Sequence, residues 1–500
     1  MTTDVSSPAR ARSGRDETHE RRRDARKMRS DARAPAVGDD ENDASESRER
    51  AASAVDDACV DAYDSDGEIG VEFHRGARPE WVDARASGTD AGAEATSYDV
   101  LVVGCGLSGA TIAERCANEL GLRVCVIDKR DHVGGNCYDY VDARCGIRRS
   151  AYGAHLFHTR HARVEAYVKR FSEWISFEHR VVGRVRVSDE GGEREALVPI
   201  PPTRDTVRAL YGESCDTDEE MEAWYARERV YYPDGPRNGE EAALSRVGPR
   251  LYEHIFRHYT KKQWDKYPEE LDASVLLRLP CRSSADDRYF SDPFQALPRR
   301  GYTRLFENML AYNEKIDVRL SCDYFELARA DALPKHKFLV YTGPIDSYYA
   351  ELGMERLEYR SLRFEEEYVD TKETDACGHF FQESFVVNYP GPDVPFTRIV
   401  EYKHTPNQPR GRAEAPGTVI VREYSCDDGE PYYPVPTQKN RDLYESYARR
   451  ASAERGVAFV GRLASYKYFN MDEAVLNALE MFDNLRETGA LEPKRAPSEF

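Results

Sequence analysis

The feature that most restricts the fold of this chain is a glycine-rich turn that follows a short apolar run. The run Val100–Val103 has the continuous apolar pattern of a strand buried on both faces of a parallel sheet. Gly104, Gly106 and Gly109 come directly after it, in the spacing Gly-x-Gly-x-x-Gly, and a helical pattern follows. Bare backbone amides at the start of a helix suit a pyrophosphate, although the same glycines also fit an ordinary tight turn.

A second apolar run ends in an acidic residue where a dinucleotide needs one. Val124–Ile127 is followed by Asp128, and a carboxylate about twenty residues beyond the turn can accept hydrogen bonds from an adenosine ribose. An acid in this place disfavours NADP. The next loop adds Gly134, Gly135 and Asn136. This combination resembles the FAD-binding half of the glutathione-reductase-like flavoprotein superfamily, and it favours a flavin over NAD.

The rest of the chain divides by composition and pattern. Residues 1–97 are rich in charged residues and poor in large apolar ones, so we expect a disordered tail. The region 161–277 reads as an inserted helical domain, because Thr217 and Glu220 have capping-box spacing and an amphipathic stretch runs from 240 to 264. The region 278–454 contains strand-like segments separated by Gly and Pro turns, namely 337–341, 385–388 and 418–422, and predicts a mostly antiparallel sheet domain.

The end of the chain resembles its beginning. Residues 457–460 form a strand-like run, and a helix-like segment covers 471–485. We therefore assign 98–160 and 455–487 to one domain. The predicted fold class is α/β, with a Rossmann-like FAD-binding domain, an inserted helical domain and a mostly antiparallel sheet domain.

Charge and cysteine content narrow the functional classes. A formal net charge of −19 argues against a broad nucleic-acid surface. No apolar run approaches the roughly 18 residues that cross a membrane. The 11 cysteines are scattered without a Cys-x-x-Cys pair, which indicates reduced thiols. We expect a cytoplasmic protein that binds neither nucleic acid nor membrane.

Eight further segments carry a more specific resemblance. They are similar to segments of the UDP-galactopyranose mutase family and occur in that family's order, within a resemblance that covers 98 to about 487: 152–159, 258–264, 278–280, 286–290, 397–399, 422–424, 431–435 and 461–463.

The resemblance implies the interconversion of UDP-galactopyranose and UDP-galactofuranose. It implies FAD that is active when reduced, with flavin N5 attacking the anomeric carbon to give a covalent flavin–sugar adduct. UDP-galactose would be the substrate and NAD(P)H or another compound the reductant, and a homodimer stays open.

The resemblance also assigns roles to single residues. Arg278 and Arg398 are expected to grip the diphosphate and stabilise the leaving UDP, and His158 to lie at the reactive edge of the flavin. Without the flanking motifs, either arginine would read as part of a surface ion pair. The remaining assignments are substrate binding by Phe256, Tyr259, Trp264, Tyr289, Tyr433 and Tyr468, and cofactor binding by His155, Arg462 and Asn470 as well as by Gly104, Gly106, Gly109, Asp128, Gly134, Gly135 and Asn136.

Two alternative functions stay open, whereas a metal site is not expected. His155 and His158 have no acidic or thiol partner at ligand spacing in the sequence, so no metal site is expected. Asn470 stands where bacterial members of the family usually carry Asp. The alternatives are an FAD-dependent oxidoreductase of the amine or phytoene oxidase type, or a silent sugar-nucleotide-binding protein.

Overall fold

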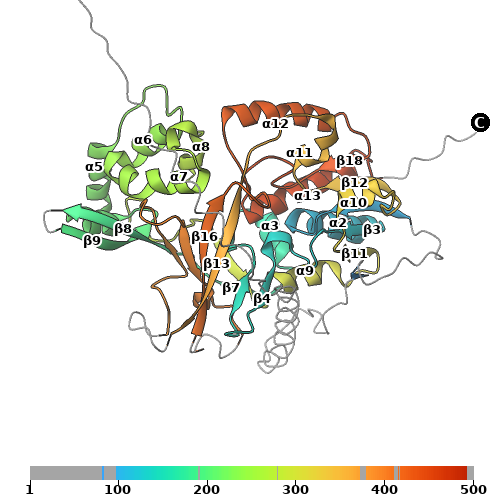
Figure 1. Cartoon of the computed structure of the whole chain (residues 1–500), viewed down its shortest axis with the longest axis horizontal. Helices are drawn as coiled ribbons and strands as arrows, with labels where there is room; N and C mark the ends of the chain where they lie inside the picture. The colour runs from blue at the N-terminus through green and yellow to red at the C-terminus, as the bar shows by residue number, and fades with distance from the viewer. Residues whose placement is uncertain are drawn as a thin grey trace, which may run out of the picture. The chain divides into compact units, whose positions relative to one another are not determined.

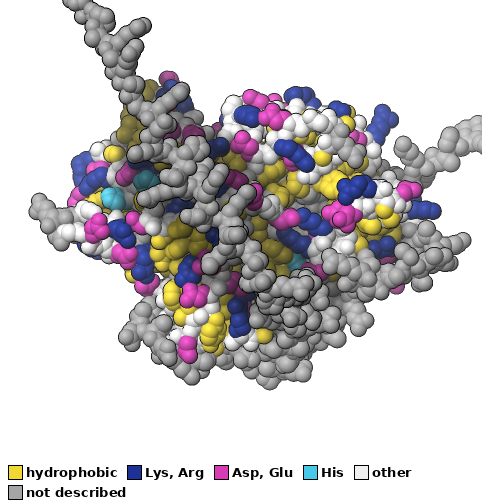
Figure 2. Space-filling view, viewed as in Figure 1, with side chains coloured by type: hydrophobic (Ala, Val, Ile, Leu, Met, Phe, Trp, Pro, Cys, Tyr) yellow, Lys and Arg dark blue, Asp and Glu magenta, His cyan; other side chains and the backbone are white. Residues whose placement is uncertain are grey.

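The computed structural model describes residues 82–83, 97–189, 192–278, 280–371, 379–409, 415 and 417–491. The predicted disorder of residues 1–97 therefore lies outside the described residues, except at 82–83 and 97. Among the described residues, no helix is long and apolar enough to cross a membrane. On the face shown in Figure 2, Lys and Arg side chains are interspersed with Asp and Glu side chains.

A six-stranded parallel sheet contains both strands predicted around the glycine turn. Its strands run in the order β1 (Val82–Asp83), β11 (Ile316–Leu320), β3 (Val124–Ile127), β2 (Tyr98–Val103), β12 (His336–Tyr341) and β18 (Val457–Phe459). Val100 and Val102 of β2 face one apolar core, and Leu101 faces another, so the sheet is buried on both sides. This arrangement confirms the predicted Rossmann-like α/β fold, including the return of the C-terminal strand to the first sheet.

Helices cover both faces of this sheet (Figure 1). One core is formed with α2 (Leu107–Leu120), α3 (Ala162–Val168), α9 (Tyr302–Leu310) and α13 (Met471–Glu487). The cores of the other face include residues of α10 (Tyr324–Arg329), α11 (Ile345–Tyr348) and α12 (Gln438–Ala451). The predicted helix 471–485 is thus confirmed as α13.

One predicted strand belongs to a different sheet than expected. The segment 337–341 was assigned to the antiparallel domain, but β12 lies beside β2 in the parallel sheet, with Leu339 opposite Leu101. Phe338, Leu339, Val340 and Tyr341 are all buried. Such a continuous apolar run suits a central parallel strand, and this is the physical reason for the difference.

A second, seven-stranded sheet is separate from the parallel one. Its order is β17 (Tyr433–Pro434), β13 (Tyr359–Asp370), β16 (Gly417–Cys426), β15 (Arg398–Glu401), β14 (Val386–Asn388), β8 (Val181–Asp189) and β9 (Gly192–Ile200). All pairs are antiparallel except β14 with β8. The strands predicted at 385–388 and 418–422 are confirmed, and the sheet is mostly antiparallel as expected.

The inserted region is only partly helical, which corrects the prediction for 161–277. After α3 and β7 (Trp174–Ser176), the chain forms the β8–β9 hairpin, because Val181, Val185 and Val187 alternate with more exposed residues at the period of a strand. The helices follow, and Figure 1 draws them in green beside β8 and β9: α4 (Arg204–Tyr211), α5 (Asp218–Glu228), α6 (Gly239–Leu251), the π-helix η2 (Tyr252–Arg257), α7 (His258–Trp264) and α8 (Ser274–Leu277).

Local signals in these helices hold in part. The capping box at the start of α5 is confirmed, since Thr217 Oγ1 accepts from the Glu220 N–H at 3.2 Å. The amphipathic stretch 240–264 is not one helix, because Gly248 has φ 76° and Pro249 follows it. The smaller elements are the sheet β6 (Phe157–Thr159), β10 (Phe294–Pro298) and β7 (Trp174–Ser176), the hairpin β4 (Asp139–Val141) with β5 (Arg148–Ser150), and the 3₁₀ turns η1 (Gly135–Cys137), η3 (Pro268–Glu270), η4 (Ala350–Leu352) and η5 (Tyr402–His404).

Candidate active site

The predicted cofactor glycines meet at one edge of the parallel sheet. Gly104 leaves β2 with φ 102°, and a Cβ on Gly109 would collide with the Gly104 carbonyl oxygen. Gly106 is the N-cap of α2, and no side chain caps that helix end. A Cβ on Gly135 would lie 3.0 Å from the Gly106 Cα, so the two glycine loops touch through bare backbone. The result is an uncapped helix N-terminus lined by backbone, which fits a dinucleotide diphosphate.

Polar side chains hold these loops in place. Asp128 accepts from the Cys105 N–H at 2.7 Å through one oxygen and from the Arg130 N–H at 2.9 Å through the other. The Arg130 guanidinium in turn donates to Asn136 Oδ1 at 2.9 Å. On the C-terminal side, a Cβ on Gly461 would lie 2.8 Å from Ser108 Oγ, so the loop after β18 reaches the first turn of α2.

His155 and His158 lie on the segment that leaves this edge. His155 Nδ1 is 2.8 Å from the Gly153 carbonyl, which can only accept, so Nδ1 carries the proton and Nε2 is left as an acceptor. Burial, and then the nearby guanidinium groups of Arg462 and Arg398, lowers the pKa of His155 to about 4, which keeps its ring neutral. His158 Nδ1 is 2.6 Å from Asp292, which sets the tautomer of that ring in the same way.

Five contacts among tyrosine, tryptophan and arginine side chains define the centre of the candidate site. The rings of Tyr433 and Tyr468 stack at 5.2 Å, and Trp264 contacts both, at 6.3 and 6.1 Å between ring centroids. The Arg278 guanidinium carbon lies 3.9 Å from the Tyr468 ring centroid, and that of Arg462 lies 5.4 Å from it. The cluster therefore joins the inserted region to both the seven-stranded sheet and the loop after β18.

The cluster carries excess positive charge. Arg398 donates to Glu423 at 2.6 Å, and among the described residues no carboxylate pairs with Arg278 or Arg462. Burial raises the pKa of Tyr468, but the guanidinium groups of Arg278, Arg462 and Arg398 outweigh that effect and lower it below its usual value. Three guanidinium groups with one compensating carboxylate suit a dianionic ligand such as a diphosphate.

The other predicted substrate residues lie at different depths. For Tyr259, burial raises the pKa, and the charge of Arg398 partly opposes that rise. Burial also raises the pKa of Tyr289, and the charge of Arg278 reduces this rise without cancelling it. Phe256 is buried in the core of the inserted region, where packing explains its presence.

Asn470 has a structural role of its own. It is the N-cap of α13, and its backbone N–H donates to Glu473 at 2.7 Å. Asn and Asp are both favoured at this position of a helix. The exchange of Asp for Asn therefore preserves the start of α13.

Two residues of the site were not found from the sequence. Glu423 is buried and fixes Arg398, yet its segment was recognised without a role for the acid. His179 is buried with an unpartnered Nδ1, and its ring contacts Tyr289 at 5.5 Å. Burial, and then Arg398 and His158, lowers the pKa of His179 to about 3. No local sequence signal marks His179, because its site contacts come from distant segments.

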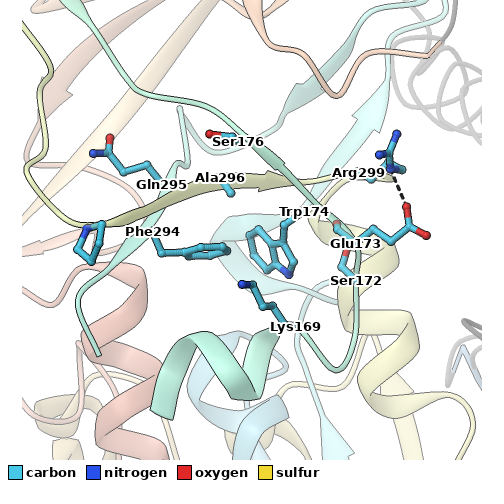
Figure 3. A pocket seen from close by; sticks show the side chains of 10 residues that line it. Lys169, Ser172, Glu173, Trp174, Ser176, Phe294, Gln295, Ala296 and Arg299 are labelled. Carbon is cyan, nitrogen blue, oxygen red and sulfur yellow. Dashed lines mark hydrogen bonds and ion pairs between the residues drawn. The ribbon is translucent and has the colours of Figure 1, made fainter. Parts of the chain in front are cut away.

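A separate surface pocket of about 570 Å³ lies beside the three-stranded sheet (Figure 3). Trp174, Phe294 and Lys169 point together in it, with Lys169 Nζ 4.7 Å from the Phe294 ring centroid, and Arg299 pairs with Glu173 at its rim. Its lining contains none of the predicted site residues. We therefore place the candidate chemistry at the arginine and tyrosine cluster.

Comparisons with known proteins give the family. A family model described as UDP-galactopyranose mutase matches residues 254–468, and one described as an NAD(P)-binding Rossmann-like domain matches 102–171. The "Probable UDP-galactopyranose mutase" of Klebsiella pneumoniae is 36% identical and covers 77% of this chain and 94% of its own length. The dTDP-fucopyranose mutase of Escherichia coli is 34% identical, over 76% of this chain and 96% of its own.

A solved structure agrees with these sequence matches. The crystal structure of a reduced UDP-galactopyranose mutase superposes with a TM-score of 0.59 at 15% identity, over 79% of this chain and 96% of that one. This structural similarity supports the fold, and the sequence identity to the two relatives above establishes the family. The chain belongs to the UDP-galactopyranose mutase family of isomerases.

Proposed function

We propose that this protein interconverts UDP-galactopyranose and UDP-galactofuranose with FAD in its reduced state. The observation that carries the proposal is the position of the arginine and tyrosine cluster beside the glycine loops. Arg462 belongs to the loop that contacts the first turn of α2, and its guanidinium also lies over Tyr468. A ligand held by the cluster would therefore lie next to a flavin bound at the glycine loops.

Each residue has a proposed role that follows from its surroundings. Arg278 and Arg398 orient the substrate diphosphate and stabilise the charge that develops on the departing UDP. Tyr289, Tyr433 and Tyr468 offer hydroxyl groups to the same diphosphate, while Tyr259 and Trp264 line the uridine and sugar pocket. We retain Phe256 only as a packing neighbour of that pocket.

The cofactor residues complete the proposal. The glycines at 104, 106, 109, 134 and 135, with Asp128 and Asn136, would hold FAD, and Asn470 would act through the start of α13. When bound and reduced, the flavin supplies the nucleophile for the anomeric carbon. His155 and His158 would present their Nε2 atoms near it, because their Nδ1 atoms are engaged by Gly153 and Asp292.

The cellular setting is also part of the proposal. All cysteines that the structure describes are free thiols, which supports a reducing compartment such as the cytoplasm. A compartment of this kind supplies NAD(P)H, the reductant that we propose.

The test compares substrates and flavin states. Purified protein should show the visible absorption spectrum of a flavin. Dithionite should switch on the conversion of UDP-galactofuranose to UDP-galactopyranose, which is measured by anion-exchange chromatography. Equal rates with oxidised and reduced protein under strict anaerobiosis would contradict the proposal. Because a relative at similar identity is a dTDP-fucopyranose mutase, the dTDP-fucose pair is assayed in parallel. A higher kcat/KM for that pair would reassign the substrate.

A further inference from the structure

Lys262 makes a three-point contact that none of the site assignments uses. It lies on α7, two residues before Trp264, and its Nζ donates to the carbonyl oxygens of Tyr389, of Val394 at 3.2 Å and of Phe396 at 3.0 Å. An ammonium group has three N–H donors, and here each has a backbone acceptor. The contact thus closes the connection between β14 and β15 around one side chain.

The clamped connection leads directly into Arg398, the first residue of β15. Both ends of the connection are held, because the Thr397 N–H donates to the Glu423 carbonyl at 2.9 Å and the Tyr389 N–H donates to the Thr397 carbonyl at 2.9 Å. Arg398 therefore emerges from a loop that is held by Lys262 on one side and by the Glu423 backbone on the other.

The helix that carries Lys262 also carries substrate residues. α7 holds Tyr259 and Trp264, and the carbonyl that follows Lys262, that of Gln263, accepts from Ser425 Oγ at 2.6 Å and from Arg360 at 3.3 Å. These bonds anchor α7 to the seven-stranded sheet. Lys262 adds the second anchor, between α7 and the loop in front of Arg398.

We propose that Lys262 is a positioning residue that sets the place of Arg398 relative to Tyr259 and Trp264, which rests on the function proposed above. Its ammonium substitutes for the water that the three loop carbonyls would otherwise need. Without it, three partly buried carbonyl groups lose a shared donor, and the loop is free to move to find new ones. A shift of about 1 Å at a charged substrate contact can cost on the order of 100-fold in rate.

The structure supports a cationic rather than a packing role. Burial lowers the pKa of Lys262 to about 8, and Asp393 is the acidic group that opposes this. Asp393 itself pairs with Arg186 at 3.2 Å, so the Lys262 ammonium depends mainly on carbonyl dipoles. A methionine of similar length would fill the space and supply no donor.

The test is a double-mutant cycle in the full chain with bound flavin. Lys262→Met, Arg398→Ala and the double variant are compared for flavin content, UDP affinity, kcat and KM. The matched control is Lys261→Met, since Lys261 precedes Lys262 on α7 and its Nζ contacts nearby residues instead, bonding to the Asp265 carboxylate at 2.9 Å and lying 5.4 Å from the Tyr267 ring centroid. We expect Lys262→Met to lower kcat/KM by about 10- to 100-fold with unchanged flavin content, and Lys261→Met to change it less than about 2-fold.

The cycle separates positioning from general stability. If Lys262 acts through Arg398, then Lys262→Met should change the Arg398→Ala background by less than about 3-fold. An equal loss in both backgrounds would overturn the inference. Lys262→Arg keeps the charge and the N–H donors, and it should retain more activity than Lys262→Met. If Lys262→Met does not fold, the cycle is run with Lys262→Arg in its place. Wild-type protein that neither binds UDP nor turns over would instead refute the proposed function.

Discussion

The buried carboxylate of Glu423 gives the sharpest test of how the site works. Its side chain is 1% exposed and accepts from Arg398 Nε at 2.6 Å, while the Arg398 side chain is 26% exposed. Removing one partner of a fully buried ion pair costs about 3–5 kcal/mol. Because solvent reaches Arg398 and glutamine still offers one acceptor, we expect about 1–3 kcal/mol for Glu423→Gln.

This loss should appear in turnover more than in affinity. The variant removes the negative charge that partly balances the arginines, so the attraction of the site for a diphosphate does not fall. The amide oxygen that remains is an uncharged and weaker acceptor, so Arg398 is oriented less firmly and stabilisation of the departing UDP falls. We expect kcat to decrease by about 5- to 150-fold with little increase in KM.

The assay follows conversion of UDP-galactofuranose by the dithionite-reduced protein. The matched control is Glu367→Gln, because Glu367 is a half-exposed glutamate that pairs with Arg422 at 2.7 Å. Such a surface pair is worth about 0–1 kcal/mol, and the control should keep wild-type turnover. A folded, flavin-loaded Glu423→Gln variant whose kcat stays within 2-fold of wild type would refute the orienting role of this carboxylate.

The other substitutions test the charges and the buried histidine. Arg278→Ala and Arg398→Ala should each lower kcat/KM by about 30- to 1,000-fold without loss of flavin, as read from steady-state rates and the visible spectrum; wild-type efficiency in either variant would remove that assignment. Burial lowers the pKa of His179 to about 3 in the folded protein. Between about pH 6.5 and pH 3, His179 is therefore neutral in the folded protein and protonated in the unfolded chain. Stability should therefore fall as pH is lowered from about 6.5 towards 3, with His179 contributing about 1.4 kcal/mol per pH unit, and His179→Gln should flatten this dependence in urea unfolding at pH 7, 6 and 5. Identical pH dependence in both proteins would contradict the buried neutral state.

The parts of the fold that the sequence predicted are those governed by local pattern. The apolar runs Val100–Val103 in β2 and Val124–Ile127 in β3 are almost wholly buried, as their patterns require. The capping box of α5 needs only residues three apart. By contrast, the sheet that β12 joins depends on pairing with β2, more than 200 residues earlier in the chain, as the Leu339 and Leu101 register shows. No local pattern contains that information.

The site divides in the same way. Motifs located the glycine loops and the arginines, and the structure brings Arg278 and Arg462 together over the ring of Tyr468. The residues that orient them were missed. Lys262 reaches carbonyl groups 127–134 residues away, and carbonyl acceptors leave no trace in residue type.

Arg278 and Arg398, which we propose bind the substrate diphosphate, are held by different contacts, and this bears on what each could do. Arg398 is fixed by a buried carboxylate and follows a loop that Lys262 clamps, so its direction is set before a ligand arrives. Arg278 lies at the end of α8, remains exposed, and rests on the face of the Tyr468 ring. A guanidinium that rests on an aromatic ring is held by the attraction of the ring face, which fixes the direction of its N–H groups less firmly than an ion pair with a carboxylate does. In the function proposed above, Arg398 would therefore fix the diphosphate against the tyrosines, and Arg278 would adjust to the charge as UDP departs and returns.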